Sequence, residues 1–435
     1  MLGHSLAAHG TPLRTPKGMG DLLPPEANAR RVLTRLVLET FELAGYDLIT
    51  TPLFEHAEVV ERGSDSLDPR DLLRFVEPES GEVAVLRPDI TPQIARVIAT
   101  RMAGHPAPWR LCYEGRVIRR RRGRARSHQQ ITQAGVECVG IAGPEADTEI
   151  VWLASRACED AGLPDFRIEL SQVTIAQSVL DTLPAVLRAP VSEALARKDH
   201  AALAALLQEA DVPAEAATRL LTLTDHYGDL DVIAEAKRAL RWPAAQAGLA
   251  NLEEIVERLA KLGLEHRLGV DLSDARGSSY YTGMSFAVLA EGPGEPVGMG
   301  GRYDRLLRRF GTDQPATGFA FDLENLQWAL RTAGVGSREA APLRLVVAGG
   351  TEARRHALAT RLRQERVVAA TLPHHADVRS CLAFTRAWGY DAALVLTRTA
   401  ARFLRTRDAA EQAVKPEDIA SIVALRAWAQ ESTKG

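Results

Sequence analysis

Apolar positions near the start of the chain follow first a helical and then a strand-like period. Residues 26–49 carry apolar side chains at helical spacing as far as Gly45, and an apolar run leads from there into "TTPLFE". Residues 72–88 contain two strand-like runs on either side of a Ser-Gly pair. The pattern predicts a long helix, a strand, and two further strands joined by a turn.

The next helix is predicted over residues 89–102, where "DITPQIARVIATRM" has apolar residues three and four positions apart. Asp89 or Thr91 is expected to be its N-cap, because short polar side chains accept hydrogen bonds from the first helical amides. Pro92 suits the first turn, since its missing amide hydrogen would be unpaired there.

Two strand-like runs, residues 109–120 and 129–140, predict a long antiparallel hairpin. Between them lies a dense arginine stretch, with seven arginines from Arg116 to Arg126. The formal net charge of the whole chain is only −3, so this stretch is a local feature and does not indicate general affinity for nucleic acid.

Polar residues on the second arm of this hairpin share one face. Gln133 and Glu137 are four positions apart, so their side chains point the same way in a strand, and Arg119 lies on the opposite arm. A glutamate on a buried sheet face is costly unless it meets a cation or a hydrogen-bond donor. Two interpretations stay open: Glu137 neutralises a neighbouring arginine, or it contacts a ligand.

The middle of the chain changes character. After a predicted helix at 146–162 and a strand at 166–172, residues 174–268 read as helical throughout and rich in alanine and leucine. We expect a helical insertion at about 174–265. Strand-like runs then return, the last followed by a helix: 266–274, 279–292, 295–311 and 318–334.

A linker over 335–342 divides the chain into a domain at 1–334 and a smaller one at 343–435. Strand and helix patterns alternate in the smaller one, which predicts βαβαβ and a small parallel sheet. The interrupted antiparallel strands of the larger domain predict an α+β fold.

Composition narrows the class of protein. With 435 residues, 46% hydrophobic and 25% charged, the chain is long enough for two or three ordinary globular domains. Its four cysteines form no CxxC pair, and no secretory signal or run of eighteen apolar residues is present, so we expect a cytoplasmic protein without disulfides, metal or membrane span. Glycines at 298, 300 and 301 match neither a P-loop nor a dinucleotide-binding motif, and no cofactor is expected.

Five motifs in this order resemble histidyl-tRNA synthetase and, more closely, the regulatory subunits of ATP phosphoribosyltransferase. They are "PKGMGDLLPPE" at 16–26, "LRPDITPQIAR" at 86–96, "RLCYEGRVIR…QQITQAGVECVG" at 110–140, "RGSSYYTG" at 276–283 and "GGRYDRLL…GFAFDLENL" at 300–326. The resemblance covers about residues 12–334. It implies a class II aminoacyl-tRNA synthetase-like antiparallel sheet core, and more faintly an anticodon-binding-like α/β domain at 343–435.

Departures from the synthetase pattern fall where ATP would bind. The resemblance implies Arg-x-Glu in the second class II motif, but the glutamate position holds Arg121 after Arg119. In the third motif Asn325 stands where an arginine would clamp the triphosphate, and Asp322 adds negative charge nearby. Losing a cationic clamp argues against adenylation, because that chemistry depends on stabilising phosphate charge.

The amino-acid pocket is better preserved. By motif position, the resemblance implies that eight residues hold histidine or a similar ligand: Asp89, Thr91, Arg119, Gln133, Glu137, Arg276, Tyr280 and Tyr281. A carboxylate suits an ammonium group, an arginine suits a carboxylate, and Glu137 or Tyr281 suits imidazole nitrogens.

Three hypotheses remain open. The resemblance favours a non-catalytic regulatory subunit, which activates a short-form ATP phosphoribosyltransferase catalytic subunit in a mixed oligomer and relays histidine inhibition in the first step of histidine biosynthesis. The alternatives are an active histidyl-tRNA synthetase and a synthetase-like module with another ligand. The class II core implies a homodimer, and we expect the arginines of residues 343–435 to form a solvated surface without tRNA binding.

Overall fold

The computed structural model describes residues 14–63, 71–119, 129–275, 280–335, 342–372 and 377–430. The chain divides into two compact units, Met1–Arg338 and Glu339–Gly435, which are described separately. Within the described ranges, no helix has both the length and the apolar character needed to cross a membrane.

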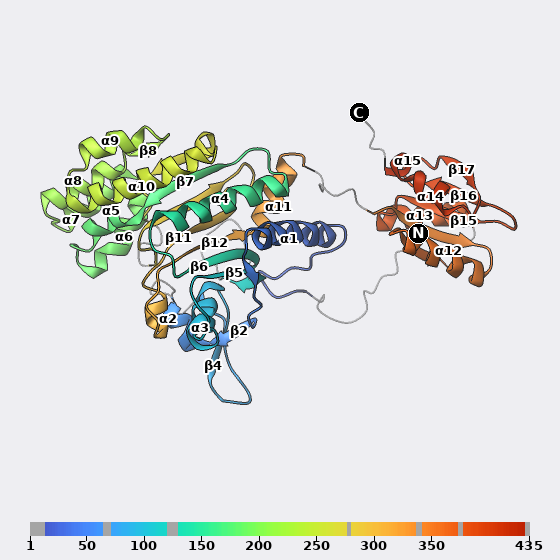
Figure 1. Cartoon of the computed structure of the whole chain (residues 1–435), viewed down its shortest axis with the longest axis horizontal. Helices are drawn as coiled ribbons and strands as arrows, with labels where there is room; N and C mark the ends of the chain where they lie inside the picture. Colours follow the sequence, from blue (N-terminus) through green and yellow to red (C-terminus); the bar gives the residue numbers. More distant parts are fainter. Residues whose placement is uncertain are drawn as a thin grey trace. The chain divides into compact units, whose positions relative to one another are not determined.

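A nine-stranded sheet forms the centre of the first unit (Figure 1). Adjacent strands of this sheet are antiparallel except for the β1–β5 and β7–β9 pairs. The predicted antiparallel α+β core is confirmed. In spatial order the strands are β1 (Asp47–Leu48), β5 (Trp109–Ile118), β6 (Gln130–Val139), β12 (Ala316–Asp322), β11 (Gly298–Arg302), β10 (Met284–Leu289), β7 (Arg167–Gln172), β9 (Leu268–Asp271) and β8 (Tyr227–Gly228).

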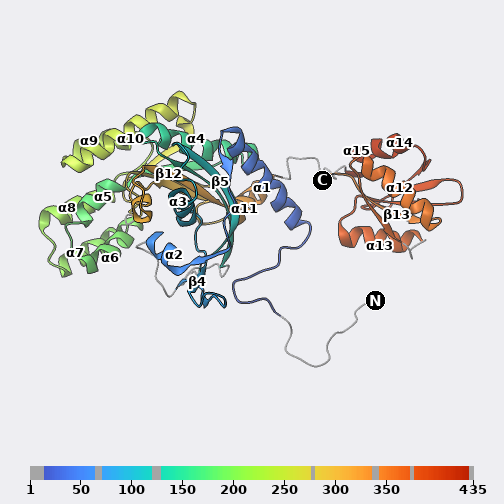
Figure 2. The ribbon, with the colours of Figure 1, turned by 60° about the horizontal axis from the view of Figure 1, so that its bottom comes forward.

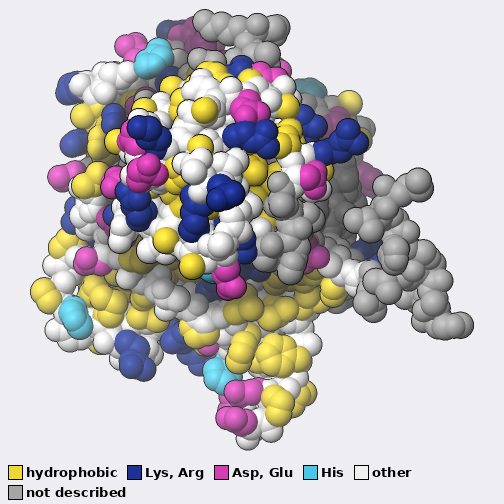
Figure 3. All heavy atoms as spheres, turned by 90° about the vertical axis from the view of Figure 1, so that its right-hand side faces the viewer, with side chains coloured by type: hydrophobic (Ala, Val, Ile, Leu, Met, Phe, Trp, Pro, Cys, Tyr) yellow, Lys and Arg dark blue, Asp and Glu magenta, His cyan; other side chains and the backbone are white. Residues whose placement is uncertain are grey.

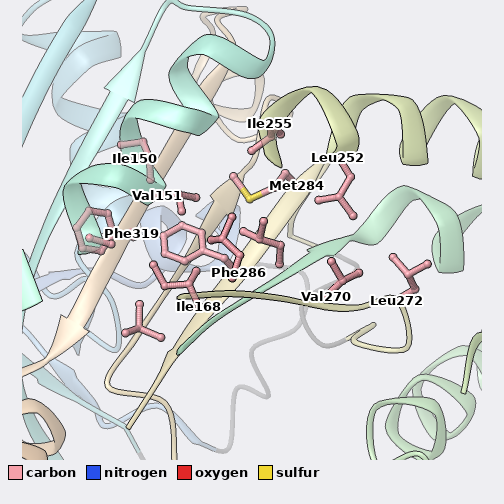
Figure 4. Packing of buried hydrophobic residues seen from close by; sticks show 14 of the residues in the cluster. Ile150, Val151, Ile168, Leu252, Ile255, Val270, Leu272, Met284, Phe286 and Phe319 are labelled. Carbon is pink, nitrogen blue, oxygen red and sulfur yellow. The ribbon is translucent and has the colours of Figure 1, made fainter. Parts of the chain in front are cut away.

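Helices cover one face of this sheet. The core cluster there joins α1 (Glu26–Leu43), α4 (Pro144–Ala161), α10 (Pro243–Lys261) and α11 (Leu323–Thr332) to the strands. Figure 4 shows apolar side chains of α4 packed near Phe286 and Phe319, and the Phe319 ring also meets Phe41 of α1 edge-on at 5.6 Å. This helical layer packs against one face of the sheet only. Other elements cover the opposite face.

The opposite face is covered by α3 (Thr91–Thr100) and the short η3 (Leu307–Phe310). Nearby are α2 (Ala57–Gly63) and a small sheet in the order β2 (Phe54–His56), β4 (Val83–Leu86) and β3 (Arg74–Val76). The predicted N-cap of α3 is wrong: Ile90 occupies that position without a capping side chain. The Asp89 carboxylate instead accepts from the adjacent Ile90 amide at 2.8 Å, and the Thr91 hydroxyl is used elsewhere.

The insertion leaves the sheet after β7 and returns at β9, and Figure 2 shows its helices gathered on one side of the first unit. Its helices are α5 (Val173–Leu180), α6 (Ala185–Ala196), α7 (His200–Glu209), α8 (Ala214–Leu223), α9 (Val232–Ala239) and α10, followed by η2 (Glu265–Arg267). The expectation of helix throughout is wrong at β8, which pairs with the end of β9. The Arg167 guanidinium holds this short strand, donating to the Gly228 carbonyl and to Asp229, each at 2.7 Å.

A buried arginine joins the sheet to the start of α4. Arg302, at the end of β11, donates to the Asp147 carboxylate at 3.0 Å and pairs with its second oxygen at 2.9 Å. The same guanidinium donates to Asp304 at 3.0 Å and to the Gly143 carbonyl at 2.8 Å. Arg302 is 6% exposed, so this network fixes the position of β11 from inside the protein.

The second unit contains a five-stranded sheet in the order β14-β13-β15-β16-β17. Parallel β13, β14 and β15 alternate with α12 and α13 as predicted, but β16 and β17 continue the sheet in antiparallel fashion, so the expectation of a purely parallel sheet is wrong. The elements are β13 (Arg344–Gly349), α12 (Glu352–Gln364), β14 (Val368–Leu372), α13 (Val378–Trp388), β15 (Ala392–Leu396), β16 (Ala401–Arg405), β17 (Glu411–Val414), α14 (Ile419–Ala424) and α15 (Arg426–Gln430).

Candidate functional site

A cavity of about 560 Å³ opens on the face of the sheet beside α3. Strands β6, β11 and β12 and the start of α3 supply its walls, and a chain segment just before β10 closes one side. Its lining includes seven of the eight residues that the resemblance implies: Asp89, Thr91, Arg119, Gln133, Glu137, Tyr280 and Tyr281. Arg276 lies outside the described residues.

Two glycines make room for the side chains of Tyr113 and Glu137. Gly135 lies directly opposite Tyr113 in the β5–β6 hairpin, and a Cβ on Gly135 would stand 2.7 Å from the Tyr113 hydroxyl. Gly318 lies opposite Glu137, and a Cβ there would overlap the Glu137 carboxylate. Because neither glycine has a side chain, Tyr113 and Glu137 lie over the neighbouring strand and their polar ends meet.

Glu137 is surrounded by hydroxyl groups. Its Oε1 atom accepts from Thr91 at 2.7 Å and from Tyr113 at 3.1 Å, and its Oε2 atom accepts from Tyr303. The side chain is 2% exposed, and loss of solvation at this depth raises its pKa well above the usual value. Its hydrogen-bond partners among the described residues are therefore neutral donors. The interpretation that a neighbouring arginine satisfies Glu137 finds no support in the described part of the chain.

The other end of the cavity carries opposite charges. Arg119 donates to the Pro88 carbonyl at 2.7 Å, and its guanidinium lies 3.6 Å from the Asp89 carboxylate. The Gln133 amide, in the orientation that satisfies both of its ends, accepts from Arg119 at 2.7 Å and donates to Asp89 at 3.2 Å. One carboxylate, one guanidinium and one amide are thus held together at the mouth of a buried hydroxyl cluster.

Aromatic rings form the side wall. Tyr280 and Tyr281 meet edge-on at 5.2 Å, and Tyr280 also lies 5.2 Å from Tyr303 with the rings inclined at 33°. Burial, together with the nearby carboxylates Glu137 and Asp89, raises the pKa of both Tyr280 and Tyr281, so both hydroxyls remain protonated donors at neutral pH.

Sequence reasoning missed two members of the cluster, Tyr113 and Tyr303. The signal for Tyr303 was present, since "GGRYD" was among the motifs that carry the resemblance. The signal for Tyr113 was the glycine of "QAGVE", since a glycine in the middle of a strand marks a close approach from the neighbouring strand.

Two residues at the positions where the sequence departs from the synthetase pattern, Asp322 and Asn325, line the same cavity, and Asp322 is the strand partner of Gln133. Asp322 also acts as the N-cap of α11, accepting from the Asn325 amide at 3.0 Å. The Asn325 side chain, 2% exposed, donates to the Pro296 carbonyl at 2.9 Å. Asn325 is therefore hydrogen-bonded to Asp322 at the start of α11 and to the loop before β11, and its side chain is a neutral amide. Arg121 lies outside the described residues.

Taken together, the cavity offers complementary groups to a small zwitterion with a ring. Asp89 suits an ammonium group, Arg119 suits a carboxylate, and the Glu137 side chain suits a ring N–H. Within the described residues, no group of three metal-binding side chains is assembled.

Comparison with known proteins gives the same fold and narrows the family. Residues 18–326 match the sequence family described as Histidyl-tRNA synthetase. An ATP phosphoribosyltransferase regulatory subunit from Anaeromyxobacter dehalogenans is 42% identical over 342 residues, covering 78% of this chain and 97% of the relative. One from Syntrophotalea carbinolica is 33% identical over 404 residues, covering 92% and 94%.

Solved structures agree. A Bacillus halodurans protein described as an ATP phosphoribosyltransferase regulatory subunit/histidyl-tRNA synthetase superposes with a TM-score of 0.74 at 26% identity, covering 87% of this chain and 97% of that one. Histidyl-tRNA synthetase from Nostoc gives 0.79 at 19% identity over 96% and 100%, a likeness of fold alone. The chain belongs to the family of ATP phosphoribosyltransferase regulatory subunits, built on the class II synthetase fold that its motifs resemble.

Proposed function

We propose that this chain is a non-catalytic regulatory subunit of ATP phosphoribosyltransferase in the cytoplasm. The observation that carries the proposal is the match to relatives of that name over 97% and 94% of their own lengths. In this role the chain activates a short-form catalytic subunit in the first step of histidine biosynthesis, and it relays feedback inhibition by histidine.

The test of this role is assembly and activation. We expect the chain to co-purify with a short-form catalytic subunit and to raise its phosphoribosyltransferase rate, and added L-histidine should lower the rate of the complex. The catalytic subunit alone is the control. Failure of the two chains to associate, or a rate that this chain does not change, would contradict the proposal.

Loss of adenylation is a separate expectation. The neutral, buried Asn325 amide cannot clamp a triphosphate, and Asp322 places a carboxylate on the same cavity wall. We therefore expect no histidine-dependent exchange of pyrophosphate into ATP, with an active histidyl-tRNA synthetase as the positive control. Exchange above background would favour the alternative function, an active histidyl-tRNA synthetase, for which the family match at 18–326 is the supporting observation.

We expect a homodimeric core formed through the N-terminal segment and α1. A groove of about 1590 Å³ runs along α1, and its lining includes Leu22, Leu23 and Trp328, which are large apolar side chains exposed in the single chain. Light scattering at micromolar concentration should give the mass of two chains, and Leu23→Glu should shift it toward one. Val186→Glu, an exposed apolar position on α6, is the control. A monomeric wild-type mass would contradict the expectation.

We expect no tRNA binding by the second unit, although it is rich in arginine. Four of its arginine side chains are held against backbone carbonyls: Arg354 on Thr397, Arg361 on Glu417, Arg363 on Ala369 and Arg386 on Thr406. On the face turned to the viewer in Figure 3, basic side chains stand among acidic, apolar and uncharged ones. A mobility assay with histidine tRNA and an unrelated tRNA checks this, and a selective, salt-sensitive affinity would refute it.

A further inference from the structure

The helical insertion is bonded to the chain segment that leads toward the tyrosine wall of the cavity. The Ser192 hydroxyl of α6 donates to the Ala275 carbonyl at 2.9 Å. Just beyond α6, the Lys198 ammonium group donates to the Asp271 carboxylate at 2.6 Å. Both acceptors lie on the stretch 271–275, which precedes Tyr280 by only a few positions.

The Lys198–Asp271 pair is more than a surface ion pair. Asp271 is 4% exposed, and its second oxygen accepts from the Ser273 amide at 3.0 Å and from the Ser273 hydroxyl at 2.6 Å. Glu169 lies on the neighbouring strand β7, where Gly269 is its partner in the register, so Glu169 and Asp271 share one face of the sheet. Lys198 therefore pairs with the buried Asp271 carboxylate and lies near the Glu169 carboxylate.

Lys198 adopts a backbone conformation that is uncommon for its residue type. Its φ of 54° lies in the left-handed region, which a residue with a side chain occupies only when its surroundings hold it there. The ammonium group also lies 4.8 Å above the Tyr227 ring, beside β8. The turn after α6 is thus fixed by contacts that aim the lysine at β9.

The far side of the tyrosine segment is anchored independently. The Thr282 amide donates to the Arg302 carbonyl at 2.7 Å, and the Asp304 amide donates to the Thr282 hydroxyl at 2.9 Å. The described residues on the two sides are therefore bonded to different parts: 271–275 to the insertion, and Thr282 to Arg302 and Asp304. Tyr280 and Tyr281 lie between the two anchors.

We propose that Lys198, assisted by Ser192, is a positioning residue for the cavity: it fixes the chain that enters the tyrosine wall, and so couples the helical insertion to ligand affinity. The expected effect on affinity rests on the proposed binding of histidine in the cavity. The expected effect of Lys198 on the structure of this segment does not. Lys198 lies outside the cavity lining, so it acts on a ligand by positioning other residues and not by contact.

The experiment compares Lys198→Met with Lys237→Met as a matched control. Lys237 of α9 pairs with Glu253 of α10, so both partners of that ion pair lie inside the insertion. In calorimetry with L-histidine, Lys198→Met should weaken binding by roughly 2- to 30-fold, the usual range for residues that modulate a site without touching its ligand. Lys198→Arg should restore most of the affinity, and Lys237→Met should leave it unchanged.

Hydrogen exchange of the full-length protein supplies a readout that needs no ligand. Amides of 280–289 should exchange faster in Lys198→Met, and to a smaller degree in Ser192→Ala, but not in Lys237→Met. Ser192→Ala removes one neutral hydrogen bond and keeps the test valid if the lysine variant fails to fold. Unchanged exchange in Ser192→Ala and in a folded Lys198→Met, or an equal change in the control, overturns the proposal. Absence of histidine binding by the wild type would count against the proposed ligand, and exchange would still decide this inference.

Discussion

Replacing Glu137 by alanine is expected to weaken the binding of L-histidine by roughly 10- to 150-fold. Burial keeps Glu137 protonated in the ligand-free chain, and a bound histidine ring supplies the counter-charge with which its carboxylate pairs. Hydrogen bonds to charged groups contribute about 1.5–3 kcal/mol, at 1.4 kcal/mol per decade of affinity. Calorimetry on the purified chain measures the change. Glu114→Ala is the control, because Glu114 is exposed on the same hairpin and points away from the cavity.

The competing interpretation is a vestigial pocket. In that case wild-type protein would give no heat with millimolar histidine, and Glu137→Ala would only lower the melting temperature. Three hydroxyl groups hold the Glu137 carboxylate in place in the absence of ligand: Thr91, Tyr113 and Tyr303. An acceptor held in this way needs little reorganisation on binding, which is the reason for expecting a functional pocket.

The same residue gives stability a predictable pH dependence. Burial raises the pKa of Glu137 in the folded state, so the folded chain retains a proton that the unfolded chain releases above about pH 4.5. Protonated Glu137 therefore makes its full contribution to the free energy of unfolding below that pH. The contribution decreases as the pH rises toward the pKa of Glu137 in the folded state. Glu137→Gln cannot ionise, so its melting temperature should gain on the wild type between pH 5 and pH 8. A constant difference would contradict the raised pKa.

The alternation of apolar and polar residues was sufficient to predict the strands that carry the site. The β5–β6 hairpin and the shared face of Gln133 and Glu137 follow from a period of two, and both are present in the structure. The assembly of Asp89, Tyr280 and Tyr281 around that face has no periodic signal, because these residues are far apart in the sequence. Only the resemblance to a known family predicted that they would meet.

The errors came where distant contacts decide local structure. Thr91 looked like an N-cap, but its hydroxyl bonds Glu137, forty-six positions away, and α3 begins without a side-chain cap. The two-residue strand β8 is too short to show alternation, and it exists because the end of β9 pairs with it. Tyr113 and Tyr303 were missed because their role depends on the space left by Gly135 and Gly318 on neighbouring strands.

Replacing Arg302 by methionine is expected to lower the free energy of unfolding of the first unit by about 3–5 kcal/mol, the usual cost of removing one partner from a buried ion pair. The change would leave Asp147, 1% exposed, without its cation, and would remove a donor from the Gly143 carbonyl. Urea denaturation followed by circular dichroism measures it. Arg308→Met is the matched control, since the Arg308–Asp313 pair is also between arginine and aspartate but is exposed, and such pairs contribute about 0–1 kcal/mol.

A double variant separates the ion pair from the packing of the arginine. Arg302→Met combined with Asp147→Leu removes both charges, so its loss of stability should be clearly smaller than the sum of the two single losses. Additive losses would mean that the pair is not coupled. The Arg302 carbonyl also accepts a hydrogen bond from the Thr282 amide, next to Tyr281. A displaced Arg302 backbone would therefore displace the tyrosine wall of the cavity. Histidine affinity should therefore fall in Arg302→Met and recover in part in the double variant, where no buried charge is left unpaired.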